Sequence, residues 1–467
     1  MKKAGTIILV LLALGFFVLN VLNGLGTVNG KVDITHTDKT SWKIDYKFDQ
    51  SVFGIMTGPI TKEYHESSWD LPEEFHFVKG EDGYSWLEKK DQSSFNQLSV
   101  KVKTYDKTVF YAPQPFVVFD FGVSINTGPL GFATKVKVIG LFEMMHNFNL
   151  NYSFYGLDNE SIIVPGTSNL VDVPINGQGY FVYFGDQSYV TETSTVQLIL
   201  DEDFPVTLRE EILPNAEKFI SFYNRELGEV LDGKLMVQMN YSKTPRDGTN
   251  GFSIGGGAQN GQFSGLAKGS VDSTETEQLT KEIRAFMAHE MGHIWQPPLG
   301  SDNMRWVNEG GAEILSYVAM TQLGMMTNEE FNTFLNKYIA ESITTLKEVS
   351  LENPHHYGHE QLNYSAGTIA MWSACKAVGG NTDNDIIFKM NRELGKFSRD
   401  SLNLHPKECL KALFTSLGMK EEAIEGINNF VNIKHDNPTE AYKLLFDNTG
   451  VNYHVLGDSL IIRLVLR

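Results

Sequence analysis

The residues best suited to chemistry in this sequence are two histidines and a glutamate in the order His-Glu-x-x-His. His289 and His293 are four positions apart, so on a helix their imidazoles share one face and can bind one metal ion. Zinc suits neutral imidazole ligands in an open tetrahedral site. Glu290 lies about 100° around the helix from His289, where it can reach a metal-bound water without being a ligand. The pattern predicts a hydrolytic zinc site with Glu290 as general base, although a structural helix can also carry it.

A second acidic motif follows, because the 15 residues at positions 294 to 308 separate His293 from Glu309. We expect Glu309 to be the third ligand, which leaves one position of the metal for water or substrate. Glu313 lies one turn further along the same helical face. It can accept the second ring N–H of a ligand histidine, or it can lie on a solvated charged face. These positions require a helix, a turn and a second helix that returns onto the first.

The flanks of the first motif have the signals of helix ends. Asp272 and Ser273 can cap the start, and Glu277 adds negative charge to the first turn. Pro297 and Pro298 stop the helix. The histidine pair is therefore expected within the last turns of this helix.

In the order of its motifs the sequence resembles the gluzincin metallopeptidases with a thermolysin-like catalytic domain, and among them the aminopeptidase N-like and glycyl aminopeptidase-like families. Asn308 to Ala312 matches their Asn-Glu-x-x-Ala, and Tyr364 to Gly367 matches a Tyr-x-x-Gly that opens a later helix. The resemblance implies that Tyr364 stabilises the oxyanion of the tetrahedral intermediate. Without the resemblance, Tyr364 reads as an ordinary packing residue. Ala366 stands where the family motif usually has a lysine.

These families also use a glycine-rich edge strand that pairs with the substrate backbone and ends in a glutamate that holds the free amino group. The matching segment comprises Gly256, Gly257, Ala258, Gln259 and Asn260. Glycines in a strand allow another backbone to approach closely. Gln259 stands in place of the glutamate, and an amide offers no formal charge to an ammonium group. The departure bears on aminopeptidase specificity and not on peptide-bond hydrolysis; a flexible loop without a substrate role is the alternative.

Taken together, the motifs predict a zinc-dependent metallopeptidase with one Zn²⁺ per chain and a peptide or protein substrate. An aminopeptidase-like activity is the first hypothesis, and an endopeptidase with an open cleft is the second. A non-catalytic binding protein on a peptidase fold is the third. That last hypothesis predicts a broken zinc or base position, whereas His289, Glu290, His293 and Glu309 are all intact.

The elements that must position these residues follow from changes in the hydrophobic period. Apolar and polar residues alternate from about Val32 to Leu200, and the helical period begins near Pro205. We predict a multidomain α+β fold with an N-terminal antiparallel β domain, a thermolysin-like α/β catalytic core and a C-terminal helical lobe. The predicted segments are a signal anchor or signal peptide at 1–26, the β domain at 27–203, the zinc catalytic core at 204–345 and the helical lobe with a terminal strand at 346–467. The alternating runs are Trp42, Ile44, Tyr46 and Phe48; Tyr180, Val182 and Phe184; and Val196, Leu198 and Leu200.

The N-terminal sequence predicts the cellular compartment of the protein. Lys2 and Lys3 precede an uncharged apolar run of 19 residues from Ala4 to Leu22, close to the roughly 20 residues that span a bilayer. The positive-inside rule places the rest of the chain outside the cytoplasm, in the periplasm or at the cell surface. We favour an uncleaved anchor at residues 4–22 over a cleaved signal that would release the protein, and a buried core helix is the third alternative.

Composition narrows the partners. The 39 Lys and Arg against 57 Asp and Glu give a formal net charge of −18, and such a surface repels phosphate backbones, so we expect no nucleic-acid partner. Cys375 and Cys409 are expected to be buried core residues and less readily a disulfide. The cluster of His355, His356 and His359 is expected in a solvated loop, with a second metal site as the alternative.

Overall fold

The structure is a computed structural model of the chain. It describes residues 27–58, 62–80, 84–105, 115–131, 133–138, 142–165, 167–168, 172–175, 179–231, 233–244, 251–271, 276–297, 304–354, 358–379, 386–400, 406–456 and 459–462. The predicted anchor at residues 4–22 lies outside the described residues, and so do His355 and His356.

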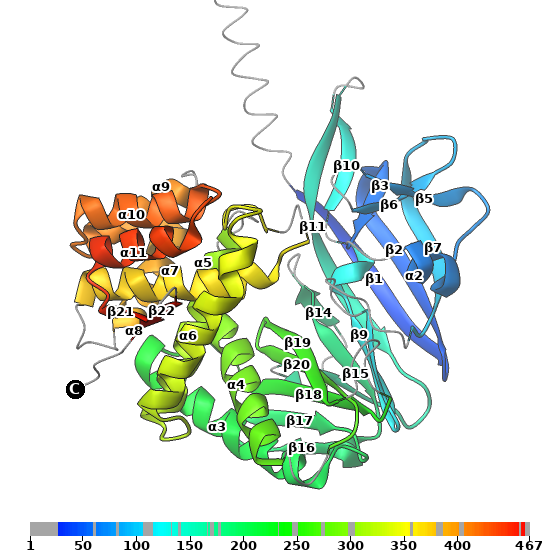
Figure 1. Cartoon of the computed structure of the whole chain (residues 1–467). Coiled ribbons are helices and arrows are strands. Elements are labelled where there is room, and N and C mark those ends of the chain that lie inside the picture. The colour runs from blue at the N-terminus through cyan, green and yellow to red at the C-terminus, as the bar shows by residue number, and fades with distance from the viewer. Residues whose placement is uncertain are drawn as a thin grey trace, which may run out of the picture. The chain divides into compact units, whose positions relative to one another are not determined.

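The first half of the chain forms strands, as the period-two pattern predicts. One sheet contains β1 Thr27–Asp38, β2 Ser41–Val52, β3 Gly54–Thr57, β4 Trp69–Asp70, β5 Phe75–Lys79, β6 Ser85–Lys89, β7 Phe95–Lys103, β10 Ala133–Val138, β11 Phe142–Tyr155 and β14 Asp172–Ile175. Its order is β4-β7-β2-β1-β11-β10-β3-β6-β5, with β14 paired to β11 (Figure 1). The alternation predicted for β2 is confirmed, because Trp42, Ile44, Tyr46 and Phe48 are buried and their neighbours are not. In contrast to a purely antiparallel domain, β1 pairs parallel with β11.

Two smaller sheets contain the other strands for which alternating burial was predicted, and these strands do not alternate. The second sheet comprises β8 Phe116–Phe119, β9 Gly122–Asn126, β12 Ser161–Val164, β13 Thr167–Ser168 and β15 Phe181–Gly185, in the order β13-β12-β15-β9-β8. The third comprises β16 Val190–Glu192, β17 Val196–Leu200, β18 Leu235–Ser242, β19 Ser253–Gln259 and β20 Gln262–Lys268, in the order β16-β17-β18-β20-β19. All five residues of β15 and the first four of β17 are buried. The prediction of alternating burial is therefore wrong for β15 and β17, because both strands lie inside their sheets and are covered on both faces.

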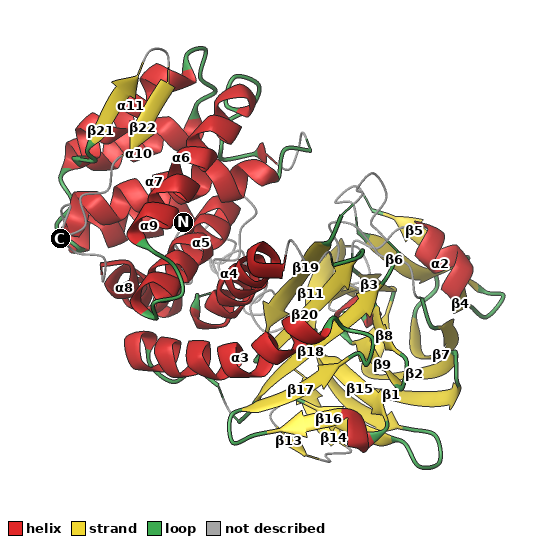
Figure 2. Cartoon of the chain, turned by 60° about the horizontal axis from the view of Figure 1, so that its bottom comes forward, coloured by secondary structure: helices red, strands yellow, loops and turns green. Residues whose placement is uncertain are grey.

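The second half is mainly helical. The chain forms α2 Lys62–Ser68, α3 Val206–Leu227, α4 Thr276–Trp295, α5 Arg305–Gln322, α6 Asn328–Thr345, α7 Gln361–Gly379, α8 Ile386–Asp400, α9 Pro406–Ser416, α10 Glu421–Asn432 and α11 Pro438–Thr449, followed by the hairpin of β21 Tyr453–Leu456 and β22 Ser459–Ile462. The α3 to α11 helices are drawn in red in Figure 2. Helix α7 is central among them, because it packs against α5, α6, α8, α10 and α11 and is buried on nearly every side.

The described chain divides into two compact units. The first unit takes the chain as far as Glu202, together with Gly233–Asn240 and Gln259–Gln262. The second takes Asp203–Asp232, Tyr241–Ala258 and the chain from Phe263 onward. The multidomain α+β class is therefore confirmed, while the four finer segments stay predictions. None of the helices described here combines the length and the apolar composition that a bilayer crossing requires.

His65 gives the first unit a testable dependence on pH. Its ring is 4% exposed and stacks on Phe77 with the ring centroids 3.8 Å apart. Burial lowers the pKa of His65 from 6.5 to about 4. Between these two values the unfolded chain binds a proton that the folded chain does not, so stability falls as the pH is lowered through this window.

We expect His65→Gln to reduce this dependence. The wild type should lose up to about 3 kcal/mol of unfolding free energy between pH 6.5 and 4 through this one group, at about 1.4 kcal/mol per pH unit. Urea denaturation at several pH values measures the slope. His76→Gln in the neighbouring strand β5 is the matched control, because His76 is only half-buried. Equal slopes in the His65→Gln chain and the wild type would contradict the prediction.

Candidate metal centre

Helix α4 is fixed at both sides of the histidine pair. Tyr223 of α3 donates a hydrogen bond to the carbonyl of Ala288 at 2.8 Å, directly before His289. At the C-terminal end the indole N–H of Trp295 donates to the carbonyl of Gly228 at 3.0 Å. The apolar side chains of Ile283, Met287 and Met291 are buried. The imidazoles of His289 and His293 therefore project from a helix that hydrogen bonds and buried apolar side chains on its other faces hold in position.

Helices α5 and α7 meet backbone to backbone beside α4. A Cβ atom added at Gly310 would lie 2.3 Å from the carbonyl carbon of Gly367, and one added at Gly367 would lie 2.9 Å from the carbonyl oxygen of Trp306. Only glycine permits such an approach. The contact joins the two predicted motifs, because Glu309 precedes Gly310 and Tyr364 lies one turn before Gly367.

The three predicted ligands are brought together. The Nε2 atoms of His289 and His293 lie 3.1 Å apart. Glu309 Oε2 lies 3.4 Å from the first and 3.3 Å from the second. Within the part of the chain that the structure describes, these residues form the one group of three histidine, cysteine or acidic side chains whose ligand atoms all lie within 4.8 Å of one another.

The donor set fits a zinc ion. Zinc–ligand bonds of about 2.0–2.2 Å in a tetrahedron place neighbouring ligand atoms roughly 3.3–3.6 Å apart, and the three observed distances are close to that range. The buried Oε2 of Glu309 makes no well-aligned hydrogen bond with any described residue, although two imidazoles face it. Two nitrogens and one oxygen that converge in this way form the ligand set of a catalytic zinc site.

The charges around the centre favour a cation. Burial opposes protonation of His289, but the carboxylates of Glu313, Glu309 and Glu290 outweigh it and raise the pKa of His289 to about 9. Burial raises the pKa of Glu309, but the imidazoles of His289 and His293 outweigh burial and hold this pKa well below its usual range. Three carboxylates thus surround two imidazoles, and this excess of negative charge suits a divalent ion.

Glu290 and Tyr364 lie beside these ligands. The phenol ring of Tyr364 stacks on the imidazole of His289 with the ring centroids 5.6 Å apart. Burial and the nearby carboxylates of Glu309 and Glu290 raise the pKa of Tyr364, so the phenol keeps its proton. Burial also raises the pKa of Glu290, against the attraction of His289 and His293. A protonated phenol and a carboxyl group of increased basicity are the donor and the base that acyl chemistry requires.

Glu313 lies behind His289 and not on a solvated face. Among the described residues Nδ1 of His289 has no hydrogen-bond partner, so acceptance of its ring N–H by Glu313 stays a prediction. The Oε1 atom of Glu313 is 3.4 Å from His289 Nδ1, and the Glu313 side chain is 14% exposed. Behind it the hydroxyls of Tyr317 and Tyr338 lie 2.8 Å apart, and burial together with the Glu313 carboxylate raises the pKa of both phenols. Neither tyrosine was predicted from the sequence. Tyr317 is one helical turn after Glu313, which is a usable signal, but Tyr338 is on α6.

Gln296 also contacts the site, although no role was predicted for it from the sequence. Its side-chain Oε1 lies 2.8 Å from Nδ1 of His293. The available signal was its position three residues after His293, on the same face of the helix.

The glycine-rich segment forms an end strand, as predicted. Gly256, Gly257, Ala258 and Gln259 belong to β19, which ends the third sheet beside β20, and Asn260 follows in a turn with a positive φ of 50°. At Gly256 a Cβ would lie 2.0 Å from the carbonyl oxygen of Ser264, whereas Gly257 faces open space. The pairing partner β20 contacts α4, because the rings of Phe263 and Phe286 are 5.5 Å apart. A substrate role for the segment stays a prediction.

The other candidate side chains lie elsewhere. His359 pairs with Glu348 at 3.3 Å and joins no metal-ligand group among the described residues. Cys375 and Cys409 are both buried, as predicted, and no disulfide links these two.

Comparison with solved structures identifies the fold. An aminopeptidase N family protein from Idiomarina loihiensis matches 89% of this chain and 78% of its own, with a TM-score of 0.59 at 11% identity. This chain has the fold of that aminopeptidase N family protein. The resemblance predicted from the motifs is therefore confirmed at the level of the fold.

Two further solved structures match with lower TM-scores. Yeast LTA4 hydrolase matches with a TM-score of 0.45 at 12% identity over 80% of this chain, and the match spans only 61% of that hydrolase. An M1 zinc metallopeptidase from Deinococcus radiodurans matches with a TM-score of 0.44 at 10% identity, over 88% of this chain and 94% of that one. No protein-family model and no curated protein matches the sequence.

The helix crossing predicts opposite effects for two glycine substitutions. Gly310→Ala should lower the free energy of unfolding by at least about 1–3 kcal/mol, because the new methyl group overlaps the α7 backbone. Gly395→Ala in α8 is the matched control, since its Cβ would meet only Pro297 at 3.9 Å. That change should add about 0.5–1 kcal/mol through helix propensity. Denaturant unfolding measures both, and a Gly310→Ala chain as stable as the control would disprove the close contact.

Proposed function

We propose that this protein is a zinc-dependent metallopeptidase that holds one Zn²⁺ per chain. The observation that carries the proposal is the convergence of His289, His293 and Glu309 on one point, with Glu290 and Tyr364 beside them. A zinc ion held by these three side chains would supply Lewis-acid polarisation of the scissile carbonyl and would lower the pKa of a water. The fold shared with an aminopeptidase N family protein supports the same activity.

The chain's own residues perform the proton transfers and stabilise charge. Glu290, which lies beside both histidine ligands, accepts the proton of the attacking water and passes it to the leaving amine. Tyr364 keeps its proton and donates a hydrogen bond to the developing oxyanion. We propose that the Glu313 carboxylate, whose Oε1 lies 3.4 Å from His289 Nδ1, accepts the hydrogen of that nitrogen in the zinc-bound site and keeps the opposite nitrogen directed at Glu309 and His293.

Substrate alignment is assigned to the segment from Gly256 to Asn260. We propose that a peptide or protein substrate adds a strand beside β19 and is held through main-chain hydrogen bonds. Aminopeptidase-like cleavage is the first form of the proposal. A zinc endopeptidase is the second form, favoured by Gln259, which has no charge with which to hold a free amino group.

The finer architecture belongs to the same proposal. We assign a thermolysin-like catalytic core to residues 204–345, which follow the β domain at 27–203 and precede the helical lobe at 346–467 in the sequence. The apolar run at residues 4–22 is proposed to attach the protein to a membrane with the catalytic core outside the cytoplasm, or to release it when cleaved.

Two substitutions separate metal binding from catalysis. Elemental analysis of the purified wild type should find about one zinc per chain, and His289→Ala should lose it. Glu290→Gln should keep the zinc while hydrolysis falls by at least about 10²-fold, because the amide cannot accept the water's proton. Zinc retained by His289→Ala would remove the ligand assignment, and unchanged hydrolysis by Glu290→Gln would remove the base.

A peptide library with free and acetylated N-termini decides between the two forms of the proposal. An aminopeptidase should cleave only the free peptides and release their first residue, because acetylation removes the positive charge that such a site binds. Mass spectrometry of the products identifies the cleaved bond. Equal cleavage of both sets at internal bonds would exclude the aminopeptidase form. The Glu290→Gln chain is the matched control for contaminating peptidases.

A further inference from the structure

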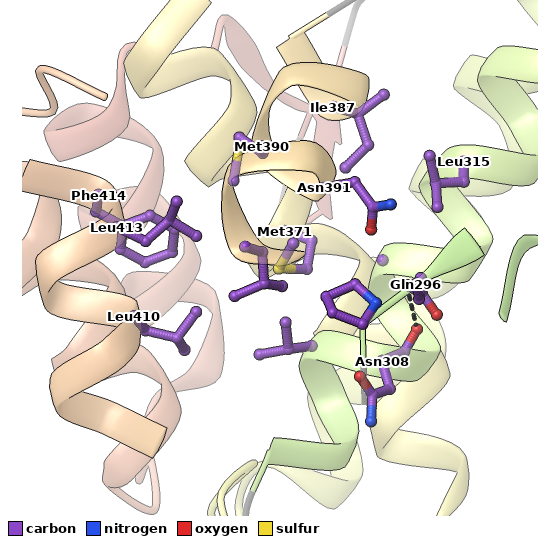
Figure 3. A pocket seen from close by; sticks show the side chains of 14 residues that line it. Gln296, Asn308, Leu315, Met371, Ile387, Met390, Asn391, Leu410, Leu413 and Phe414 are labelled. Carbon is purple, nitrogen blue, oxygen red and sulfur yellow. Dashed lines mark hydrogen bonds between the residues drawn. The ribbon is translucent and has the colours of Figure 1, made fainter. Parts of the chain in front are cut away.

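Gln296 joins the two helices that carry the predicted metal ligands. It follows the last residue of α4, and its side-chain Oε1 lies 2.8 Å from Nδ1 of His293. Its Nε2 donates a hydrogen bond of 3.0 Å to the backbone carbonyl of Asn308, the residue before Glu309 (Figure 3). One side chain therefore contacts a histidine ligand and the backbone beside the carboxylate ligand.

The amide orientation fixes the hydrogen on the imidazole. The carbonyl of Asn308 can only accept, so the amide nitrogen of Gln296 must face it and the amide oxygen must face His293. An amide oxygen can only accept, so Nδ1 of His293 must carry the hydrogen. The tautomer with this hydrogen has its lone pair on Nε2, the atom that lies 3.3 Å from Glu309 Oε2.

The surroundings hold the amide in this place. Gly311 of α5 leaves the space that the amide occupies, because a Cβ there would lie 2.7 Å from Gln296 Nε2. The main chain is fixed as well, since the Gln296 N–H bonds to the carbonyl of Gly292 at 3.1 Å and Asn391 donates to the carbonyl of Trp295 at 2.8 Å. A side chain set between two helices in this way has little freedom to turn.

We propose that Gln296 is a positioning residue that holds His293 as the tautomer with a hydrogen on Nδ1 and that couples α4 to α5 at the metal centre. The inference rests on the proposed function, since it assigns the support of a zinc ligand. The two ligand histidines are then supported differently, with the Glu313 carboxylate behind His289 and a neutral amide behind His293. A neutral acceptor sets the tautomer without adding a fourth carboxylate to the centre.

Zinc affinity of the full chain, measured by competition with a chelator, tests the role. Gln296→Met keeps the length of the side chain, but its thioether is only a weak acceptor and cannot donate to the Asn308 carbonyl, so we expect an affinity about 10-fold to 100-fold lower. Gln296→Glu restores an acceptor and should bind zinc more tightly than Gln296→Met. The visible spectrum of the Co²⁺-loaded chain should shift in Gln296→Met and return toward that of the wild type in Gln296→Glu.

Gln278→Met is the matched control, because it makes the same change on α4 at an exposed residue that bonds only to Glu282 among the contacts described. It should leave zinc affinity unchanged. If Gln296→Met and Gln296→Glu lose affinity equally, packing and not the acceptor holds His293, and the tautomer assignment is wrong. If the wild type binds zinc and cleaves peptides, and Gln296→Met binds zinc as tightly as the wild type, the role of Gln296 is wrong and the proposed function stands. A wild type that binds no zinc overturns the proposed function itself.

A second variant leaves Gln296 chemically intact. Gly311→Ala should displace the amide and lower zinc affinity, although alanine favours the helix and the thermal midpoint should not fall. In a Gln296→Ala chain the methyl group has space, so Gly311→Ala should cause no further loss of affinity. Equal effects of Gly311→Ala in both backgrounds would show that the two residues do not act together and would overturn the proposal.

Discussion

The close crossing of α5 and α7 at Gly310 and Gly367 is the constraint on which the centre depends. Packed helices usually lie about 8–10 Å apart, a spacing that side chains set. Here a single methyl group at Gly310 would enter the α7 backbone. The crossing therefore brings Glu309 and Tyr364, which are 55 positions apart in the sequence, to the same imidazole without long bridging side chains. The motif glycines are thus part of the site's geometry, although they carry no chemistry.

Charge balance is the second condition. Burying Glu290, Glu309 and Glu313 together would cost several kcal/mol for each uncompensated charge. The chain limits this cost by placing His289 among all three and by placing the phenols of Tyr317 and Tyr338 behind Glu313. A cation held by His289, His293 and Glu309 would itself compensate the negative charge of the carboxylates. The supporting residues and the ligands therefore belong to a single electrostatic unit.

The sequence predicts well what local periodicity determines. His289 and His293 could be placed because four-residue spacing defines one face of a helix, whatever the rest of the chain does. Glu309 could be placed because the gap after His293 fits a turn and a second helix that returns onto the first. The alternation in β2 is equally local, because successive side chains of a strand point to opposite faces. The sequence does not reveal that β15 and β17 are covered on both faces, because burial of a strand depends on its distant neighbours. Tyr338 was missed for the same reason, since its partner Tyr317 is on another helix. Gln296 was missed although His293 lies only three positions before it, and its second contact, to the Asn308 carbonyl, depends on how α5 packs beside α4.

Substrate recognition follows a different logic from the metal centre. Gly256 packs against the Ser264 carbonyl, while Gly255 and Gly257 face open space. A strand of this kind offers main-chain groups, which bind any peptide backbone and select no side chain. Gln259 adds an amide that can hydrogen-bond to an ammonium group or to a peptide N–H with no strong preference. Within the proposed function the strand therefore sets the register of the substrate. Selection of a free N-terminus requires a carboxylate from outside this strand.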